Sequence, residues 1–554
     1  MAPGPLPAIV LLCVGIAAAQ SQPPARDPSR APREGTGVIR GRVVRADTGE
    51  PLRRVQVRVD EWSAKDQGGP VSTMTDAEGR YELTQLPAGS YQLKATRGGF
   101  VEVSYGQRRP FERGRPLELS EGAVLEKIDF ALPPGGVVTG RVVDEVGEAV
   151  AQVSVSLARR RYVEGVRRLV PQAGGSTDDR GEFRIYGVPP GDYVMVAVFD
   201  PVDFGARDRT RYVPTYYPGT PVVGEAQRVT VSVGHETSGM TIPLARAATA
   251  VVRGVVRPSG QVSLGPFAFI SAREIGGARA DAHVATAIVA SDGAFSLTGL
   301  LPGTYLVETQ SMSGTAAASK EVIVGGADIA GLTLVLSEGA RARGRIVFDT
   351  GKPPQGLRPS QVLVTATLDR EMGRVDMNGG PPVARDDWSF EVRGLRGRGV
   401  MVAGTFDGDW RMKRVRRDGV DVTDTPLDFS GDAGDAADID DLEIELTDRL
   451  TVVSGTVSDD RAGVALDAAV VVFADDESRW GPRSRFIESA RPDQYGRFTI
   501  RGLPPGKYTA IAVGYLEPGE EHDPELLQAW RPRGTSFTLS EGETHALDLK
   551  LSGS

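Results

Sequence analysis

Alternation of apolar and polar residues is the dominant pattern along this chain. It is clear in "VQVRV" (55–59) and "VSVSL" (153–157), where every second residue is apolar. Successive side chains of a strand point to opposite faces, so a period of two indicates strands that bury one face. These stretches are short, and Gly, Pro and Asp stand between them. The pattern therefore predicts an all-β chain of short antiparallel strands.

One block of this pattern recurs four times. It reads "TDAEGRYELTQLPAGSYQL" at 75–93, "TDDRGEFRIYGVPPGDYVM" at 177–195, "SDGAFSLTGLLPGTYLV" at 291–307 and "PDQYGRFTIRGLPPGKYTA" at 492–510. Its two turn glycines are ten residues apart each time, and a Tyr follows two residues after the second. Asp bonds nearby amides and Gly tolerates positive φ, so the block predicts turn, strand, turn, strand. The expected turn residues are Asp76, Gly79, Gly89, Asp178, Gly181, Gly191, Gly293, Gly303, Asp493, Gly496 and Gly506.

Each block belongs to a longer unit that begins with a glycine-marked strand. The marker glycines are Gly41, Gly140, Gly254, Gly344 and Gly455, which lie 99, 114, 90 and 111 residues apart. A unit of that length exceeds a solenoid repeat of about 20–45 residues. It suits an independent β-sandwich. We therefore predict five tandem antiparallel β-sandwich domains in an elongated array, at 37–133, 134–247, 248–338, 339–448 and 449–554.

The combination V-x-G-x-V, T-D-x-x-G-x-Y/F and L-P-P-G-x-Y resembles the carboxypeptidase regulatory-like domain. The resemblance covers nearly all of 37–552 as five copies and implies Ig-like, prealbumin-like seven-stranded sandwiches. Copy four departs from the pattern, because Asp387 replaces the turn glycine, "RGRG" (396–399) replaces the Pro-Gly turn and Gly399 replaces the Tyr. Family relatives accompany catalytic or transport modules, and similar sandwiches bind carbohydrates. The resemblance thus implies a non-catalytic binding role.

The N-terminus predicts export. Residues 8–19 form an apolar run that ends in three alanines, too short to span a bilayer and typical of a signal peptide cleaved after Ala19. A buried first strand is the alternative, but residues 20–36 form a polar, Pro-rich linker. The single cysteine, Cys13, lies in the run, so the mature chain is expected to lack thiols. We expect a periplasmic, cell-surface or secreted protein.

Charge and hydropathy narrow the possible partners. The net charge of −9 over 554 residues includes no basic domain or stripe, which argues against nucleic acid. Nothing after the first run is apolar enough to cross a membrane.

The histidines do not assemble a predicted metal site. There are four, His235, His283, His522 and His545. His522 and Glu525 have the H-x-x-E spacing of metallocarboxypeptidases, but catalytic zinc needs three protein ligands and only 29 residues follow Glu525. We interpret "HDPELLQAW" as a short surface helix with Asp523 as N-cap and Pro524 at its first position. No catalytic residue, metal or cofactor is predicted.

An acidic run at 428–446 has three interpretations. Its aspartates could hold calcium, form a solvated loop, or pair with the basic run "WRMKRVRR" (410–417). The solvated loop is favoured, because the spacing matches no calcium loop. The aspartates concerned are Asp432, Asp435, Asp438, Asp440 and Asp441.

Aromatic loops after the Tyr strands are the candidate ligand-contact sites. "RYVPTYYPGT" (211–220) and "LLQAWRPRGT" (526–535) carry them, with a diluted version in "VSYGQRRPF" (103–111). Flat rings with polar tips stack on sugars or anchor proteins, or else cover the edge of a sandwich. The candidates are Tyr212, Tyr216, Tyr217 and Trp530.

The sequence thus predicts a non-catalytic, exported binding or scaffold protein whose partner is a polysaccharide or a cell-envelope protein. The alternatives are an accessory component of an outer-membrane transport system that acts in trans, and part of a zinc carboxypeptidase.

Overall fold

A computed structural model of the chain describes most residues from 35 onward. The described residues are 35–63, 71–163, 165–199, 210–259, 262, 264, 268–275, 284–310, 316–368, 382–405, 408–430, 437–461, 463–481 and 483–552. The predicted signal peptide, most of the linker and Cys13 lie outside them. Within them nearly every element is a strand, and the α-helix they contain is α1 (Pro524–Trp530). The all-β prediction is confirmed.

Residues 37–133 form two sheets, because the apolar residues of their alternating strands meet between them. The first sheet contains β4 (Arg80–Leu86), β1 (Gly37–Arg45), β8 (Val124–Leu125) and β9 (Phe130–Leu132). The second contains β3 (Ser72–Met74), β2 (Gln56–Ser63), β5 (Gly89–Thr96), β6 (Val103–Ser104) and β7 (Leu117–Leu119). The buried cluster between them runs from Ile39 to Leu132.

The same two-sheet plan recurs in the next two segments. The second has β13 (Glu182–Val188), β10 (Gly136–Val143) and β18 (Glu236–Pro243) in one sheet, and β12 (Val166–Ser176), β11 (Ser154–Val163), β14 (Gly191–Val198), β16 (Thr215–Tyr216) and β17 (Arg228–Val231) in the other. A small pair, β15 (Thr210–Tyr212) and β19 (Arg246–Ala248), follows. The third has β23 (Ala294–Leu300), β20 (Ala250–Pro258) and β26 (Ile329–Leu336) against β22 (Val284–Ile288), β21 (Phe269–Glu274), β24 (Gly303–Gln310) and β25 (Ala317–Val324).

The fourth segment merges its strands into one sheet. The order is β28 (Val362–Leu368), β30 (Arg398–Thr405), β31 (Arg411–Arg417), β34 (Ile439–Thr447), β27 (Ala340–Phe348) and β29 (Ser389–Leu395), with β32 (Val420–Asp421) and β33 (Leu427–Asp428) at its sides. The strand β31 makes this connection, because it pairs with β34 along its length and with β30 at Gly404. The segment therefore departs from two separate sheets.

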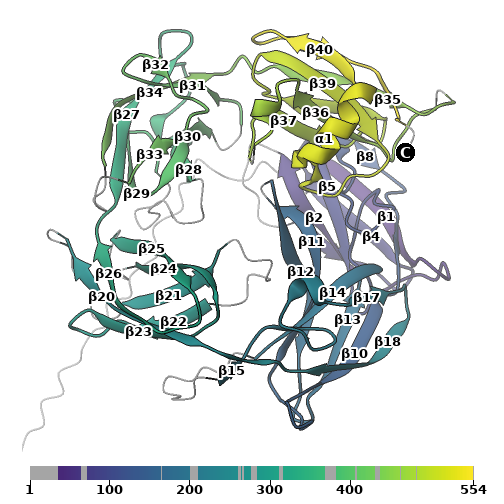
Figure 1. Ribbon diagram of the computed structural model, residues 1–554. Coiled ribbons are helices and arrows are strands. Elements are labelled where there is room, and N and C mark those ends of the chain that lie inside the picture. The colour runs from purple at the N-terminus through teal and green to yellow at the C-terminus, as the bar shows by residue number, and fades with distance from the viewer. Residues whose placement is uncertain are drawn as a thin grey trace, which may run out of the picture.

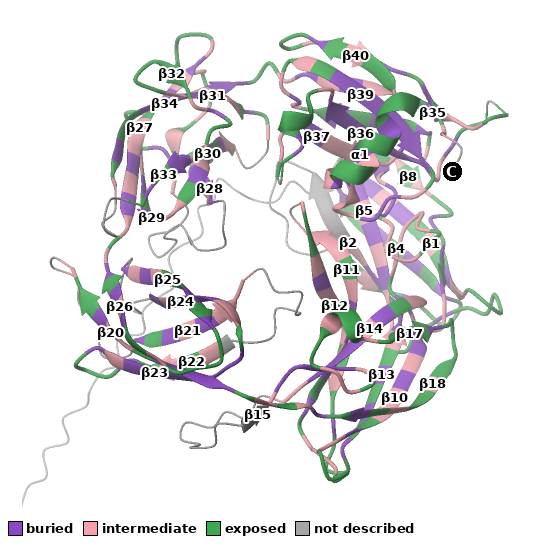
Figure 2. Ribbon diagram, in the orientation of Figure 1, coloured by how far each residue is buried: buried purple, intermediate pink, exposed green. Residues whose placement is uncertain are grey.

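The fifth segment returns to two sheets. One contains β38 (Arg497–Arg501), β35 (Val452–Ser458), β41 (Thr544–Ala546) and β42 (Leu549–Lys550). The other contains β37 (Ile487–Ala490), β36 (Ala469–Ala474), β39 (Gly506–Val513) and β40 (Thr535–Leu539). We refer to 37–133, 134–247, 248–338, 339–448 and 449–554 as modules 1 to 5, and their boundaries remain predictions. Buried residues follow the strands within each module (Figure 2).

The marker glycines have one shared structural cause. Each lies where the closing strand of its module runs parallel to the first strand, as β18 does to β10. A Cβ on Gly41 would lie 1.9 Å from the Ile128 carbonyl oxygen, and one on Gly455 1.9 Å from that of Leu547. The corresponding distances for Gly140, Gly254 and Gly344 are 2.0, 2.1 and 1.9 Å. Only glycine lets the two backbones approach this closely.

The repeated tyrosines also share a role. Tyr91, Tyr193 and Tyr508 are at most 1% exposed, and each hydroxyl donates to the carbonyl oxygen of the proline four residues earlier at 2.6 Å. In the third copy the Tyr305 hydroxyl accepts from the Leu301 amide at 3.1 Å. The ring fills the core while its hydroxyl ties the second turn to the strand that follows.

Tyr508→Phe is expected to destabilise module 5 by about 1 kcal/mol, because it removes one intramolecular hydrogen bond and keeps the ring. Hydrogen exchange of the β36 and β39 amides measures this change locally. Tyr495→Phe is the control, since Tyr495 is 56% exposed. Equal exchange in both variants would show that the hydroxyl bond contributes nothing.

Copy four requires a correction at its turn. Gly344 pairs with Phe390 in the register in which Gly41 pairs with Tyr81, so the turn-glycine position falls on Trp388 and not on Asp387. Trp388 has φ 65°, the positive value that glycine has in the other copies. Its ring packs edge-on against Phe348 with centroids 4.8 Å apart, and this packing offsets the strain of a non-glycine residue there.

The modules close on themselves, and this differs from the elongated array that the sequence predicts. Figure 1 shows module 5, in yellow, next to modules 1 and 2, while modules 3 and 4 complete the circuit on the other side. Residues 108–118 contact residues 466–521 through hydrogen bonds and ion pairs, for example Arg113 to Glu521 at 2.8 Å. The repeat pattern carries no information on this contact, because it joins side chains about 400 residues apart.

Candidate functional site at the junction of modules 1, 2 and 5

The loop between β39 and β40 shapes the module 5 side of the junction. It contains η6 (Glu520–His522), α1 and η7 (Arg531–Arg533). The Asp523 side chain accepts a hydrogen bond from the Glu525 amide at 3.0 Å and Pro524 opens α1, so the predicted capped helix is confirmed. Leu527 and Trp530 pack on the outer face of the β36–β39 sheet. The helix thereby holds residues 515–523 in a fixed position.

Module 1 contacts this loop through the segment after β6. The Tyr515 hydroxyl donates to the Pro110 carbonyl oxygen at 3.1 Å. Arg113 donates to Ser489 Oγ at 3.1 Å and to Glu521 Oε1 at 2.8 Å, and the Glu521 side chain is only 7% exposed. Arg115 donates to Asp467 Oδ1 at 3.1 Å. The nearly buried Glu521 and the more exposed Asp467 therefore both receive arginines from the other end of the chain.

Module 2 contributes Arg159 at the centre of the junction. Its guanidinium donates to both carboxylate oxygens of Glu517, at 3.0 and 3.2 Å, and lies 3.8 Å from the ring centroid of Phe111 of module 1. The single Tyr515 hydroxyl hydrogen is shared between this carboxylate, at 2.8 Å, and the Pro110 carbonyl oxygen, at 3.1 Å. A two-pronged arginine–carboxylate pair next to an aromatic face is strong and directional. Three modules therefore meet at one side chain.

The backbones also come close here. A Cβ on Gly519 would lie 2.1 Å from the Tyr162 carbonyl oxygen, and Gly519 has φ 97°. Arg167, which pairs with Tyr162 across β11 and β12, places its Nη2 atom 3.3 Å from Asp523 Oδ2. The Asp523 side chain is 3% exposed. The strands β11 and β12 of module 2 thus fit against the module 5 loop in shape and in charge.

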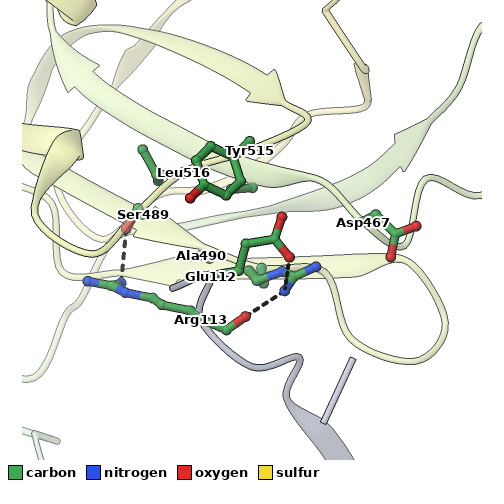
Figure 3. A pocket seen from close by; sticks show the side chains of 9 residues that line it. Glu112, Arg113, Asp467, Ser489, Ala490, Tyr515 and Leu516 are labelled. Atoms are coloured by element: carbon green, nitrogen blue, oxygen red, sulfur yellow. Dashed lines mark hydrogen bonds and ion pairs between the residues drawn. The ribbon is translucent and has the colours of Figure 1, made fainter. Parts of the chain in front are cut away.

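A small pocket lies beside these contacts (Figure 3). Glu112, Asp467, Ser489, Arg491 and Tyr515 line it, and its volume of about 20 Å³ suits a single water molecule. The Arg491 side chain is 6% exposed; Nη1 donates to the Arg113 carbonyl oxygen at 2.5 Å and lies 3.9 Å from Glu112 Oε2. Its Nη2 has no hydrogen-bond partner among the described residues. Burial lowers the pKa of this guanidinium.

His522 is a partly buried histidine in the same loop, and its environment favours the neutral imidazole. Burial lowers the pKa of its imidazole, which Glu521 opposes and Arg113 reinforces, and its Nδ1 has no hydrogen-bond partner among the described residues. A lowered pKa means that the folded loop binds the proton less readily than the unfolded chain does. The stability that this group contributes is therefore present above its usual pKa of about 6.5 and lost as pH falls below it.

His522→Asn is expected to reduce the loss of thermal stability between pH 7 and pH 5.5. Burial raises the pKa values of Glu520 and Glu488, so these two groups add stability as the pH falls. Both are present in the variant and in wild type, so the difference between the two proteins reports His522 alone. Melting temperatures measured at both pH values give the two slopes. Parallel slopes would show that His522 does not titrate on unfolding. His235→Asn is the control, because that histidine lies in an exposed turn.

The four aromatic residues predicted to contact a ligand differ in how far they are exposed to solvent. Tyr216 is fully buried and Trp530 is 9% exposed, so the expectation that these two rings are open to a ligand is corrected. Each covers the outer face of a sheet, Tyr216 against Ala158 and Val196, and Trp530 against the β36–β39 sheet. Tyr212 and Tyr217 are partly exposed and pack against the module 2 core.

The structure does not assemble a zinc site around His522 and Glu525. Glu525 lies in the first turn of α1 and its side chain is 84% exposed, whereas the Nδ1 atom of His522 is inaccessible to solvent. In the parts of the chain that the structure describes, no three His, Asp or Glu side chains gather as a metal site. None of the helices there has the length and apolar character needed to cross a membrane.

The acidic run pairs with arginines where it is described. Asp438 and Asp440 contact Arg343 at 3.0 and 2.9 Å, while the basic run pairs with Glu443 and Glu445, for example Arg414 with Glu445 at 2.9 Å. Asp441 has φ 59° at a bulge of β34. Asp432 and Asp435 lie outside the described residues. The predicted pairing with the basic run is therefore made by Glu443 and Glu445 of the acidic run, whereas Asp438 and Asp440 pair with Arg343 of β27.

The Asp and Gly residues of the first predicted turn occupy that turn, and the glycines of the second lie where the next strand begins. The amides of Arg80, Glu182 and Arg497 donate to Asp76, Asp178 and Asp493 at 2.7, 2.8 and 2.9 Å. The following glycines have positive φ: Gly79 75°, Gly181 70°, Gly293 85° and Gly496 77°. Gly191 also has a positive φ, whereas Gly89, Gly303 and Gly506 begin β5, β24 and β39.

The junction residues carry no signal of their own in the sequence. Arg159, Glu517 and Glu521 are ordinary members of a chain in which 25% of residues are charged. The segment "VSYGQRRPF" was the one indication, since it holds Pro110 and Phe111 and follows the Tyr strand of module 1. Identifying the partners would have required knowing that the modules form a closed arrangement.

Comparison with known proteins gives a family match for module 1. Residues 38–133 match the carboxypeptidase regulatory-like domain. No curated protein sequence matches the chain.

Three solved structures with some likeness to this chain are distant from it in sequence. The TIE protein of Bacillus anthracis is 11% identical, with 93% of this chain and 73% of that chain covered and a TM-score of 0.15. GBS52, the minor pilin of Streptococcus agalactiae, is 16% identical, with 41% and 99% covered and a TM-score of 0.20. Two B repeat units of the collagen-binding protein of Staphylococcus aureus are 11% identical, with 74% and 99% covered and a TM-score of 0.13. Likenesses at these scores do not bear on function.

Proposed function

We propose that this chain is an exported, non-catalytic scaffold of β-sandwich modules that binds partners through the loops after its Tyr strands. One observation carries the proposal: the loops of modules 1 and 5 bind each other through Tyr515, Pro110, Arg113 and Glu521. These loops lie at equivalent places in two copies of the repeat. A loop that is free to vary on a rigid sandwich is a usual place for recognition.

The partner we propose is a polysaccharide or a cell-envelope protein. Tyr212 and Tyr217 in the corresponding loop of module 2 are partly exposed, and the Tyr212 hydroxyl is held by Glu145 at 2.9 Å. A ring with a fixed orientation loses little conformational freedom when it stacks on a sugar. The match of module 1 to a regulatory-like domain supports a binding role over catalysis.

A glycan array and a set of purified envelope polymers, probed with residues 20–554, test this function. We expect saturable binding to at least one polymer, weakened about fivefold or more by Tyr217→Ala. Tyr186→Ala is the matched control, since Tyr186 is 64% exposed on β13, outside the loop. Equal weakening by both substitutions would remove the loop from the proposal. Zinc-dependent peptide hydrolysis that disappears in His522→Ala would contradict the non-catalytic assignment.

A further inference from the structure

We propose that the interface between modules 1 and 2 and module 5 also forms between two copies of this chain. Module 5 of one copy then binds modules 1 and 2 of another, and the closed monomer exchanges with a closed dimer. This inference goes beyond the proposed function, because it needs no external ligand.

The two halves of the interface are different and complementary. The basic face consists of Arg113, Arg115, Arg159 and Arg167, and the acidic face consists of Asp467, Glu517, Glu521 and Asp523. Every member of one face contacts a member of the other at 2.8–3.3 Å. In one further pair the charges are exchanged, because module 1 supplies the carboxylate of Glu112 and module 5 supplies Arg491. This exchange favours the one docking orientation in which all the pairs form. Opposite faces on one chain make a heterologous interface, which closes in pairs or rings of copies.

The carboxylates of the acidic face are largely buried while they are paired with the basic face. The side chains of Glu517, Glu521 and Asp523 are 10%, 7% and 3% exposed with the basic face in place. A carboxylate that loses its arginine partner in such a setting is costly to leave unpaired. An opened chain is therefore driven to restore these pairs, either within itself or with a neighbour.

The closed monomer and the exchanged dimer would contain the same contacts between modules 1 and 2 and module 5. Modules 3 and 4 join the two faces along the far side of the closed arrangement (Figure 1). A second copy would present the same Arg159, Phe111 and Tyr162 to the same Glu517 and Gly519. The closed monomer is favoured at low concentration because its own modules 3 and 4 hold the two faces together at a high effective concentration, and the exchanged dimer gains as the chain concentration rises.

Two single charge reversals test the exchange. Arg159→Glu and Glu517→Arg each place like charges at the junction, so neither variant can form the native pair alone. In a mixed dimer of the two variants, one junction joins the two substituted positions as a pair of reversed sign, and the other joins native Glu517 to native Arg159. We expect native mass spectrometry of an equimolar mixture to show a heterodimer of twice the monomer mass that is at least tenfold enriched over either homodimer. Circular dichroism checks that both variants fold, which we expect because both positions lie outside the five module cores.

The double variant in one chain is the control, because it restores the pair with reversed sign and should be a compact monomer. A second measurement does not depend on the variants. Isotopically labelled and unlabelled wild-type chains are combined near millimolar concentration in 1 M salt, where ionic pairing is screened, and returned to low salt. We expect mixed dimers whose fraction falls on dilution. Absence of mixed dimers at every concentration, or a variant mixture that contains no heterodimer, overturns the proposal.

Discussion

Arg159→Glu is expected to open the closed arrangement of the five modules. The new carboxylate would face Glu517, whose side chain is 10% exposed, and the contact of the Arg159 guanidinium with the Phe111 ring at 3.8 Å would be lost. Leaving a buried charge without its partner costs about 3–5 kcal/mol. We therefore expect small-angle X-ray scattering to give a larger radius of gyration and a longer maximum dimension than for wild type, while the melting of the modules is retained.

Arg160→Glu is the matched control for this experiment. Arg160 is the next residue of β11, is exposed, and points to the opposite face of the strand, so the substitution changes the net charge equally without touching Glu517. Its scattering curve should superimpose on that of wild type. If the curve of Arg159→Glu did so as well, the junction would not be what holds the modules together.

Gly455→Ala is expected to destabilise module 5 by about 3 kcal/mol, near the upper end of the usual cost of adding a methyl group to a packed site. The new Cβ would lie 1.9 Å from the Leu547 carbonyl oxygen, and backbone cannot move aside as a flexible side chain can. The parallel pairing of β35 with β41 and β42 would have to separate. Hydrogen exchange of these strands, or the melting transition of module 5, measures the effect.

Gly514→Ala serves as its control within the same module. Nothing lies within 4 Å of a Cβ at that position, and its φ is not in the positive range. The substitution should leave the stability of module 5 unchanged or slightly raised. If Gly455→Ala were equally neutral, the close approach of the closing strand would not explain the marker glycines.

Local features of the modules could be predicted from the sequence because their causes are local. A strand with a period of two, an Asp that binds amides two to four residues ahead, and a Tyr that binds a carbonyl four residues back need only neighbouring residues. The same holds for the capped helix at Asp523 and Pro524. Copy four shows the limit, because the register that assigns the turn to Trp388 depends on pairing with β27.

The sequence by itself determined the all-β class, the repeated turns and the short helix. The tertiary structure decided that the chain closes, that Tyr216 and Trp530 are covered, and that Arg159 meets Glu517 and Phe111. The physical reason is the distance along the sequence between the residues that make each contact. Hydrogen bonds within a turn or hairpin repeat with the sequence, whereas a contact between charged side chains 358 residues apart depends on how whole modules are placed.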